Sequence, residues 1–336
     1  MKKTLCFGEL LLRLSPPGDI NWLLQNQLPA FVGGAEANVA TALATWQMPA
    51  AFCTALPDNF VSLQLAQYLQ QKNIDVSPIH YSGNRIGIYY LQQGADMKNN
   101  AVVLDRTDSS FATLKRGMID WDSILEGISW FHFSAIAPAL SASAADVCLE
   151  ALEAAAKKNI RISVDLNHRS KLWQFGKQPI DIMPALTQYC DVVMGNLWAA
   201  HLMLGIPIDE KVHENASKET YLHHALNSAE AIKKQFPKVQ FVANTFRFDK
   251  GEGIAYFTAL HADKLYASAE YGSINVVDKV GSGDCYMGGL IYGLLNNHSP
   301  QQTVDFATAA AFNKLFIKGD TTNMSVEAIN ATIKHD

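Results

Sequence analysis

Residues 278–284 read Asp-Lys-Val-Gly-Ser-Gly-Asp, a small-residue turn that could hold an anion beside a carboxylate. The β-branched run 274–277 precedes the turn, and an apolar segment that is a predicted buried helix follows it. A strand, a tight turn and a helix start direct several backbone N–H groups toward one point. Gly281 and Gly283 place no Cβ between those groups and a ligand. An anion cradle beside the carboxylate of Asp284 is the arrangement that phosphoryl transfer to an alcohol requires.

The same residues also allow a purely structural role. Aspartate is a favoured N-cap, and glycine-rich turns before helices are common. The turn is not a Walker A loop, because no Gly-Lys-Ser/Thr follows, and it lacks the G-x-G-x-x-G spacing of dinucleotide-binding folds. The turn alone therefore leaves a helix cap and a catalytic site as open alternatives.

The composition is that of an ordinary soluble globular protein, with 49% hydrophobic and 18% charged residues. A net charge of −5 argues against nucleic acid and anionic membranes as partners. Glu9 and Arg13 interrupt the apolar N-terminal stretch, so we expect no signal peptide. The five cysteines form no C-x-x-C pair, so we expect core cysteines in a cytoplasmic protein, without a disulfide framework or zinc site.

Short apolar strands alternate with alanine-rich amphipathic helices through most of the chain. The predicted strands are residues 5–8, 51–54, 129–134, 161–165, 192–194, 240–244 and 254–257. The predicted helices are residues 35–46, 144–158, 222–235, 285–296, 300–317 and 325–333. This alternation predicts an α/β fold, with a mainly parallel sheet covered by helices on both faces.

Two segments, residues 10–31 and 85–106, break the alternation. They are punctuated by glycine and proline and lack a helical period, which predicts a small separate sheet inserted into the main domain. The main domain would then comprise residues 1–9, 32–84 and 107–336. The polar stretch 209–220 is a predicted surface loop.

Four stretches of the chain resemble PfkB-type carbohydrate kinases of the ribokinase-like group, over nearly its full length. Gly33-Gly34-Ala35-Glu36-Ala37-Asn38-Val39-Ala40 and Gly281-Ser282-Gly283-Asp284 resemble the N-terminal and C-terminal signatures of that family. Residues 165–173 and 104–106 resemble segments typical of 2-keto-3-deoxygluconate kinases. The resemblance implies a Rossmann-like domain with a β-sheet lid, a sugar between lid and sheet, and a homodimer paired through the lids.

The resemblance also implies how the turn would work. Asp284 would be the catalytic base, the amides of Gly281, Ser282 and Gly283 would hold phosphate oxygens, and Mg²⁺ would bridge the phosphates of ATP. Nucleotide contacts are expected from Asn167, Asn196, Thr245, Arg247 and Asn313.

Arg106 and Arg169 are the expected substrate-defining pair. A guanidinium fork matches the carboxylate of a sugar acid, whereas a neutral hexose needs no arginine. A surface salt bridge is the alternative for each arginine. By resemblance, the other sugar contacts are Gly34, Asn38, Tyr90 and Asp320, with an exposed turn aspartate as the alternative for Asp320.

Several positions depart from the family pattern. Arg247 stands where the family has the glycine of a Thr-x-Gly turn, and Lys279 stands where it has threonine. Asn196-Leu197-Trp198-Ala199 lacks the glutamate of the Asn-x-x-Glu motif near the metal, and Leu104 replaces a tyrosine of many sugar-acid kinases.

The sequence predicts an ATP-dependent kinase of the terminal hydroxyl of a sugar acid, 2-keto-3-deoxygluconate, giving its 6-phosphate. Leu104 keeps open a kinase of a neutral ketose of the fructose or tagatose type. The missing glutamate keeps open a catalytically silent sugar-acid-binding protein. Retention of Asp284 and the glycines argues against the silent protein, because a binder needs no base at the phosphate.

Overall fold

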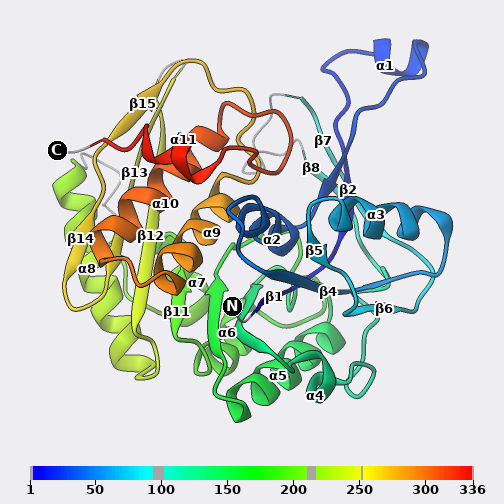
Figure 1. Ribbon diagram of the computed structural model, residues 1–336, viewed down its shortest axis with the longest axis horizontal. Coiled ribbons are helices and arrows are strands. Elements are labelled where there is room, and N and C mark those ends of the chain that lie inside the picture. Colours follow the sequence, from blue (N-terminus) through cyan, green and yellow to red (C-terminus); the bar gives the residue numbers. More distant parts are fainter. Residues whose placement is uncertain (1–2, 94–101, 210–216, 251–252, 335–336) are drawn as a thin grey trace.

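The centre of the molecule is a mainly parallel sheet with helices on both faces (Figure 1). The computed structural model describes residues 3–93, 102–209, 217–250 and 253–334. Within these ranges the sheet has eleven strands, in the order β14-β13-β12-β11-β10-β9-β1-β4-β5, with β15 beside β13 and β6 beside β4. Their bounds are β1 Lys3–Phe7, β4 Ala50–Leu56, β5 Ile74–Asp75, β6 Ile79–Tyr81, β9 Ile128–Ser134, β10 Arg161–Asp165, β11 Val192–Met194, β12 Phe241–Lys250, β13 Gly253–His261, β14 Leu265–Ala267 and β15 Tyr271–Ser273.

The main sheet separates the hydrophobic core into two layers, and helices cover the sheet on both faces. Side chains of β9 point to both layers: Trp130 belongs to the layer that contains residues of α2, α3, α9 and α10, whereas Phe131 and Phe133 belong to the layer that contains residues of α5, α6, α7 and α8. The helix bounds are α2 Ala35–Thr45, α3 Phe60–Gln70, α4 Trp121–Ile124, α5 Ala142–Lys157, α6 Pro179–Thr187, α7 Leu197–Leu204, α8 Lys218–Gln235, α9 Ser282–Leu295, α10 Pro300–Lys314 and α11 Val326–Asn330. The α/β fold class expected from the sequence is confirmed.

The structure differs from the expected secondary structure at two places in the C-terminal half. Strand β12 runs to Lys250, so residues 244–247 lie inside a strand and not in a turn, because all of them pair with β13. Residues 274–277 are not a strand, since β15 ends at Ser273. The amides of Val277 and Asp278 instead donate to the carbonyl of Leu315, at 2.8 and 3.1 Å.

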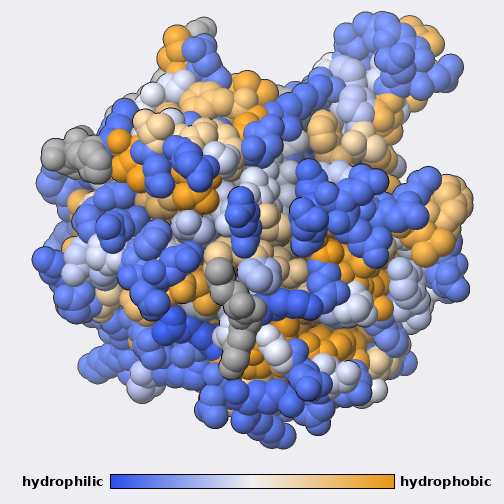
Figure 2. Space-filling view, in the orientation of Figure 1, coloured by the Kyte–Doolittle hydropathy of each residue, from blue (hydrophilic) through white to orange (hydrophobic). Residues whose placement is uncertain are grey.

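A second sheet of four strands, in the order β3-β2-β7-β8, stands apart from the main sheet. Its strands are β2 Leu11–Leu14, β3 Ala30–Gly33, β7 Gly87–Leu91 and β8 Val102–Asp105. They fall in the two irregular segments of the sequence, although β3 extends two residues past the expected limit. Residues 15–29, between β2 and β3, form an arm that projects from this sheet and carries the short helix α1, Asn21–Leu24, at its end (Figures 1 and 2).

All five cysteines, which the sequence predicts to be core residues, are buried. Residues 210–216 of the expected loop 209–220 lie outside the described residues, and α8 begins at Lys218.

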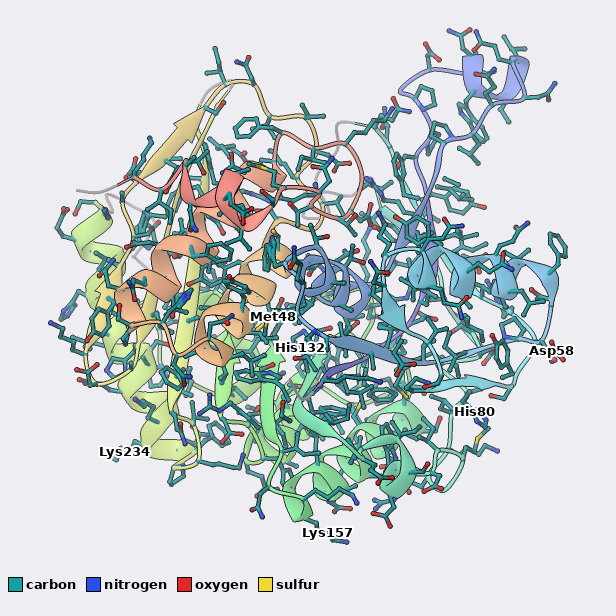
Figure 3. The ribbon with its side chains drawn as sticks, in the orientation of Figure 1. Met48, Asp58, His80, His132, Lys157 and Lys234 are labelled. Carbon is teal, nitrogen blue, oxygen red and sulfur yellow. The ribbon has the colours of Figure 1, made fainter. Side chains whose placement is uncertain are left out.

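His132, labelled in Figure 3, is a core histidine: its ring lies 3.0 Å from Ser163 Oγ, and burial lowers its pKa to about 3. Within the described ranges, every helix is too short or too polar to span a lipid bilayer.

Candidate active site

A cavity lies at the carboxyl edge of the parallel strands, where ligands bind in folds of this type. Asp165 contributes to it from the end of β10, and Leu11 and Tyr89 contribute from the small sheet. The third wall is formed by residues 279–284 of the glycine turn, the name used here for residues 278–284. The cavity therefore joins the small sheet, the main sheet and the predicted phosphate-binding residues in one place.

The glycine turn exposes the start of α9 to the cavity. Gly281 is the N-cap of α9 with φ +78°, and a Cβ on it would lie 1.8 Å from the carbonyl oxygen of Asp320, so only glycine fits. The first intrahelical bond runs from Cys285 N to Gly281 O, at 2.9 Å. Helix geometry thus leaves the amides of Ser282, Gly283 and Asp284 without intrahelical partners, at the positive end of the helix dipole. These groups can bind phosphate oxygens.

The carboxylate of Asp284 contacts α2. Its Oδ2 accepts a hydrogen bond of 2.7 Å from Asn38 Nδ2, and the N-cap of α9 is Gly281 and not Asp284. The carboxylate is 8% exposed, and burial raises its pKa to about 8, helped by the nearby carboxylates of Asp165 and Glu36. The geometry therefore favours a base at the cavity over a helix cap.

Asp165 and Glu36 are two carboxylates at the cavity that the sequence analysis did not assign. Asp165 Oδ1 accepts from the amide of Asn167 at 3.0 Å, and burial raises the Asp165 pKa to about 6. Glu36 Oε1 accepts from the amide and the hydroxyl of Ser134, at 2.9 and 2.5 Å, and burial raises the Glu36 pKa to about 7. Asp165 stands at the end of a predicted strand, and this position could have indicated that it lies at the ligand-binding edge of the sheet.

The expected sugar-side residues come together in the cavity wall. Gly34, the N-cap of α2 with φ +137°, lies against the backbone of Glu9, whose carbonyl oxygen would be 2.5 Å from a Cβ. Asn38, Arg106 and Arg169 also line the cavity. Arg106 is 8% exposed and its Nε donates to Glu9 Oε2 at 2.5 Å, so it is a buried ion pair and not a surface salt bridge.

Tyr89, and not Tyr90, is the tyrosine of β7 among the described residues that line the cavity. Successive side chains of a strand point to opposite faces, so only one of the two can face the site. Tyr89 is 5% exposed, and its hydroxyl donates to Asp320 Oδ2 over 3.4 Å. The structure therefore does not bring Tyr90 to the cavity wall, and the sequence does not show which face of β7 meets the cavity.

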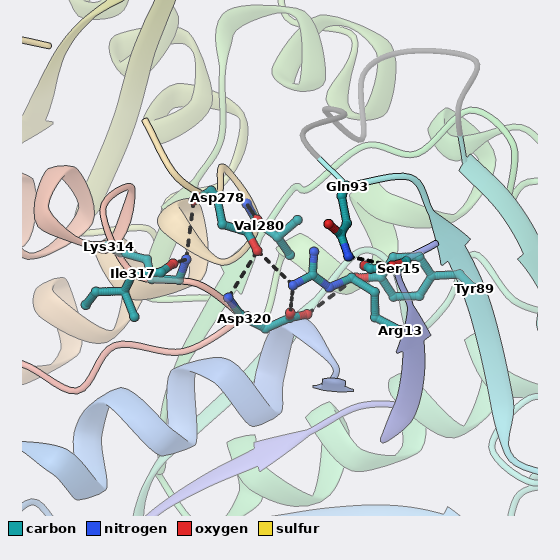
Figure 4. A network of polar contacts seen from close by, with 10 residues as sticks. Arg13, Ser15, Tyr89, Gln93, Asp278, Val280, Lys314, Ile317 and Asp320 are labelled. Carbon is teal, nitrogen blue, oxygen red and sulfur yellow. Dashed lines mark hydrogen bonds and ion pairs between the residues drawn. The ribbon is translucent and has the colours of Figure 1, made fainter. Parts of the chain in front are cut away.

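Asp320 lies at the cavity edge, but it is buried in an ion-pair network and is not an exposed turn residue (Figure 4). Arg13 of β2 contacts Asp320 Oδ1 at 2.7 Å and Asp278 Oδ2 at 2.8 Å. Asp278 Oδ2 also accepts from the amide of Gly319 at 3.1 Å. Burial raises the Asp320 pKa to about 6, against the attraction of Arg13. One arginine thus connects the small sheet to the glycine turn.

Four of the five expected nucleotide residues line the same cavity: Asn167, Asn196, Thr245 and Arg247. Asn196 additionally caps α7, because its Oδ1 accepts from Ala199 N at 2.8 Å.

Asn313 lies elsewhere. Its side-chain amide donates to Ala309 O at 2.8 Å and to Thr332 Oγ1 at 2.7 Å, and it is not among the described residues of the cavity wall. The described residues also contain no cluster of three His, Cys, Asp or Glu side chains arranged for a metal ion.

Known proteins resemble the chain over almost its whole length. Residues 1–325 match the model of the pfkB family of carbohydrate kinases. The crystal structure of 2-dehydro-3-deoxygluconokinase from Thermotoga maritima superposes with a TM-score of 0.87 and 33% identity, covering 98% of this chain and 97% of that one. The 2-dehydro-3-deoxygalactonokinase of Haloferax volcanii is 25% identical over 98% of this chain and 95% of its own. A fructokinase from Xylella fastidiosa with bound ATP shares the fold, with a TM-score of 0.73 and 17% identity, over 98% of this chain and 97% of that one.

Proposed function

Because the chain belongs to the pfkB family of carbohydrate kinases, we propose that it phosphorylates the terminal hydroxyl of 2-keto-3-deoxygluconate with ATP, giving the 6-phosphate. The observation that carries the substrate is that Arg106 and Arg169 line the same cavity as Asp284. The carboxylate of a sugar acid can bind the guanidinium groups of Arg106 and Arg169, which leaves its terminal hydroxyl to reach the carboxylate of Asp284.

In this reaction Asp284 accepts the proton of the sugar hydroxyl. The hydroxyl oxygen forms a bond to the γ-phosphorus, the bond from that phosphorus to the β–γ bridging oxygen breaks, and ADP leaves. A pKa of about 8 places Asp284 near the optimum for a general base at neutral to mildly alkaline pH. The Asn38 amide holds the accepting carboxylate in place.

Charge on the transferred group would be met by the amides at the start of α9 and by the cations at the cavity edge. Arg247 and Lys279 both line the cavity, and a positive group there fits the polyphosphate of ATP. MgATP is the expected form of that substrate, with Mg²⁺ held by phosphates and water. The chain's own contribution is the orientation of the phosphate at the glycine turn.

Glu9 bears on substrate choice through its ion pair with Arg106. The pair uses Nε of Arg106, and a guanidinium carries four further N–H donors that can contact a carboxylate. The pair also offsets part of the positive charge of Arg106, which supports the second candidate, a kinase of a neutral ketose of the fructose or tagatose type. A catalytically silent sugar-acid-binding protein is the third.

A coupled ADP-release assay over a panel of sugars separates these candidates. We expect turnover with 2-keto-3-deoxygluconate and little with fructose or tagatose. Turnover of the neutral ketoses alone would establish the second candidate. A folded protein that binds sugar acids but consumes no ATP with any sugar of the panel would establish the silent one.

We also propose that residues 10–31 and 85–106 form a lid over the sugar, and that two copies pair through their arms. Ile20, Leu23 and Leu24 at the end of the arm are 63%, 54% and 71% exposed, and apolar side chains exposed together on one short segment are typical of interaction sites. A mass by light scattering equal to one chain would contradict the homodimer. The buried cysteines fit the reducing cytoplasm, which we propose as its compartment.

A further inference from the structure

Lys314 is a fully buried lysine directly behind the glycine turn. It is the last residue of α10 and is 0% exposed. Its ammonium group donates to two backbone carbonyl oxygens, Ile317 O at 3.0 Å and Asp278 O at 3.4 Å (Figure 4). The mechanism above makes no use of this charge.

An ammonium ion held by carbonyl oxygens has the surroundings of a bound monovalent cation. Backbone carbonyl oxygens replace the water shell of such ions in proteins. Burial lowers the Lys314 pKa, while Asp278 and Asp320 favour its charged form. Removing an ammonium group from water is costly unless its hydrogen bonds are replaced, and here carbonyl oxygens replace them.

The contact with Asp278 fixes the entry of the glycine turn. A trans peptide is planar, with its C=O and N–H groups pointing in opposite directions. Holding the carbonyl of Asp278 toward Lys314 therefore directs the amide of Lys279, a cavity residue, away from the buried lysine.

Three other hydrogen bonds tie the turn and the residue before it to the end of α10. Ser282 Oγ donates to Ala311 O at 2.9 Å, and Val277 and Asp278 donate their amides to Leu315 O. Lys314 is thus the charged member of a set of contacts that position the phosphate-facing amides.

We propose that Lys314 is a positioning residue for phosphoryl transfer, a tethered cation that holds the glycine turn in the shape that binds the phosphates of ATP. The proposal rests on the kinase function proposed above. A consequence is that no free monovalent cation is needed to order the turn, because the ammonium group already occupies that position.

The test compares Lys314→Met, which keeps an unbranched side chain but lacks the ammonium group, with Lys318→Met, which alters an exposed lysine of the segment that follows α10. MgATP affinity is measured by calorimetry, without sugar, so the result does not depend on the identity of the sugar. We expect Lys314→Met to weaken MgATP binding about 10- to 100-fold, and Lys318→Met to leave it unchanged. Potassium or ammonium chloride should restore binding to Lys314→Met, and tetramethylammonium chloride at the same ionic strength should not.

Unchanged MgATP affinity in Lys314→Met would overturn the proposal, as would a loss in a folded variant that no monovalent cation restores. Wild-type protein provides a second test if the variant does not fold. Its MgATP affinity should be equal in potassium and tetramethylammonium salts, and a strong requirement for potassium would overturn the proposal. If wild-type protein binds MgATP but phosphorylates no sugar, the proposed function fails while this inference is still decided by the binding data.

Discussion

Asn38 Nδ2 donates a 2.7 Å hydrogen bond to Asp284 Oδ2, across 246 positions of sequence. The bond stabilises the carboxylate form of Asp284 and lowers its pKa, whereas burial raises that pKa and the charges of Asp165 and Glu36 raise it further. Both groups sit on buried faces of helices, α2 and α9, that contact each other. The basicity of Asp284 is therefore set by the packing of two helices.

Replacing Asp284 by Asn tests the base. The amide cannot accept the proton, so kcat should fall about 10²- to 10⁴-fold. Its oxygen can still accept from Asn38, so the fold should persist. The matched control is Asp146→Asn, which alters an exposed aspartate of α5 and should leave kcat unchanged. A fully active Asp284→Asn variant would remove Asp284 as the base.

The same substitution should stabilise the protein at alkaline pH. The Asp284 pKa is raised from its usual 3.8 to about 8, so its contribution to stability is complete below pH 4 and is lost as the pH rises through 8. Asparagine does not ionise, so at pH 8 the free energy of unfolding should be about 1–3 kcal/mol higher than in wild type. Chemical denaturation at pH 4 and pH 8 measures the difference. An equal effect at both pH values would show that ionisation of Asp284 is not its cause.

Asp165→Asn should shift the pH dependence of catalysis. The rising limb of kcat/KM for the sugar reports the ionisation of the base, with an expected apparent pKa of about 8. Removing the negative charge of Asp165 makes ionisation of Asp284 easier, so the limb should move to lower pH by roughly half to one unit. Rate measurements from pH 5.5 to 9.5 check the shift, a range chosen to bracket the limb by about one unit or more. A limb that stays in place would mean that another group controls it.

Strand and helix order could be predicted wherever apolar runs are short and cleanly bounded. The runs at Arg161–Asp165 and Val192–Met194 are such cases, and the structure has both with the expected ends. The length of β12 could not be predicted, because residues 245–250 are polar and aromatic and become a strand only through pairing with β13.

Some residues of the candidate site could likewise be predicted from the sequence, and others could not. Gly281 and Asp284 stand together in one short motif and could be found without the fold. Glu9 and Arg13 could not, since each is a single charge in an apolar stretch until the fold pairs it with Arg106 or with Asp278. These charges are far apart in the sequence and meet only in the folded protein.

Gly281→Ala should damage both stability and phosphate binding. The left-handed φ costs alanine about 1 kcal/mol, and the new Cβ would also collide with the carbonyl oxygen of Asp320. Gly117→Ala is the matched control, because Gly117 has φ +81° but nothing within 4 Å of its Cβ. We expect Gly117→Ala to lower the free energy of unfolding by about 1 kcal/mol and to keep full activity. We expect Gly281→Ala to lower the free energy of unfolding further and also to bind MgATP more weakly. Equal losses in the two variants would show that the Asp320 backbone yields without cost.

Arg13→Met should separate the small sheet from the glycine turn. Arg13 is 4% exposed, stacks on the Phe31 ring at 4.3 Å and pairs with Asp278 and Asp320. Removing it leaves the buried carboxylate of Asp320 and the partly buried one of Asp278 without that cation, which should cost about 3–5 kcal/mol of unfolding free energy. Denaturation with urea measures this loss. Arg116→Met, which breaks an exposed ion pair with Glu153, is the control and should cost less than about 1 kcal/mol.

The loss of Arg13 should also weaken MgATP binding, because Asp278 supports the glycine turn through its bonds to the amides of Val280 and Gly319. Arg13→Lys keeps a charge but loses the planar fork that reaches both carboxylates, so its MgATP affinity should lie between those of wild type and Arg13→Met. Calorimetry at a temperature where all three proteins are folded makes the comparison. If Arg13→Met is less stable but binds MgATP as wild type does, then Arg13 holds the small sheet in place without shaping the glycine turn.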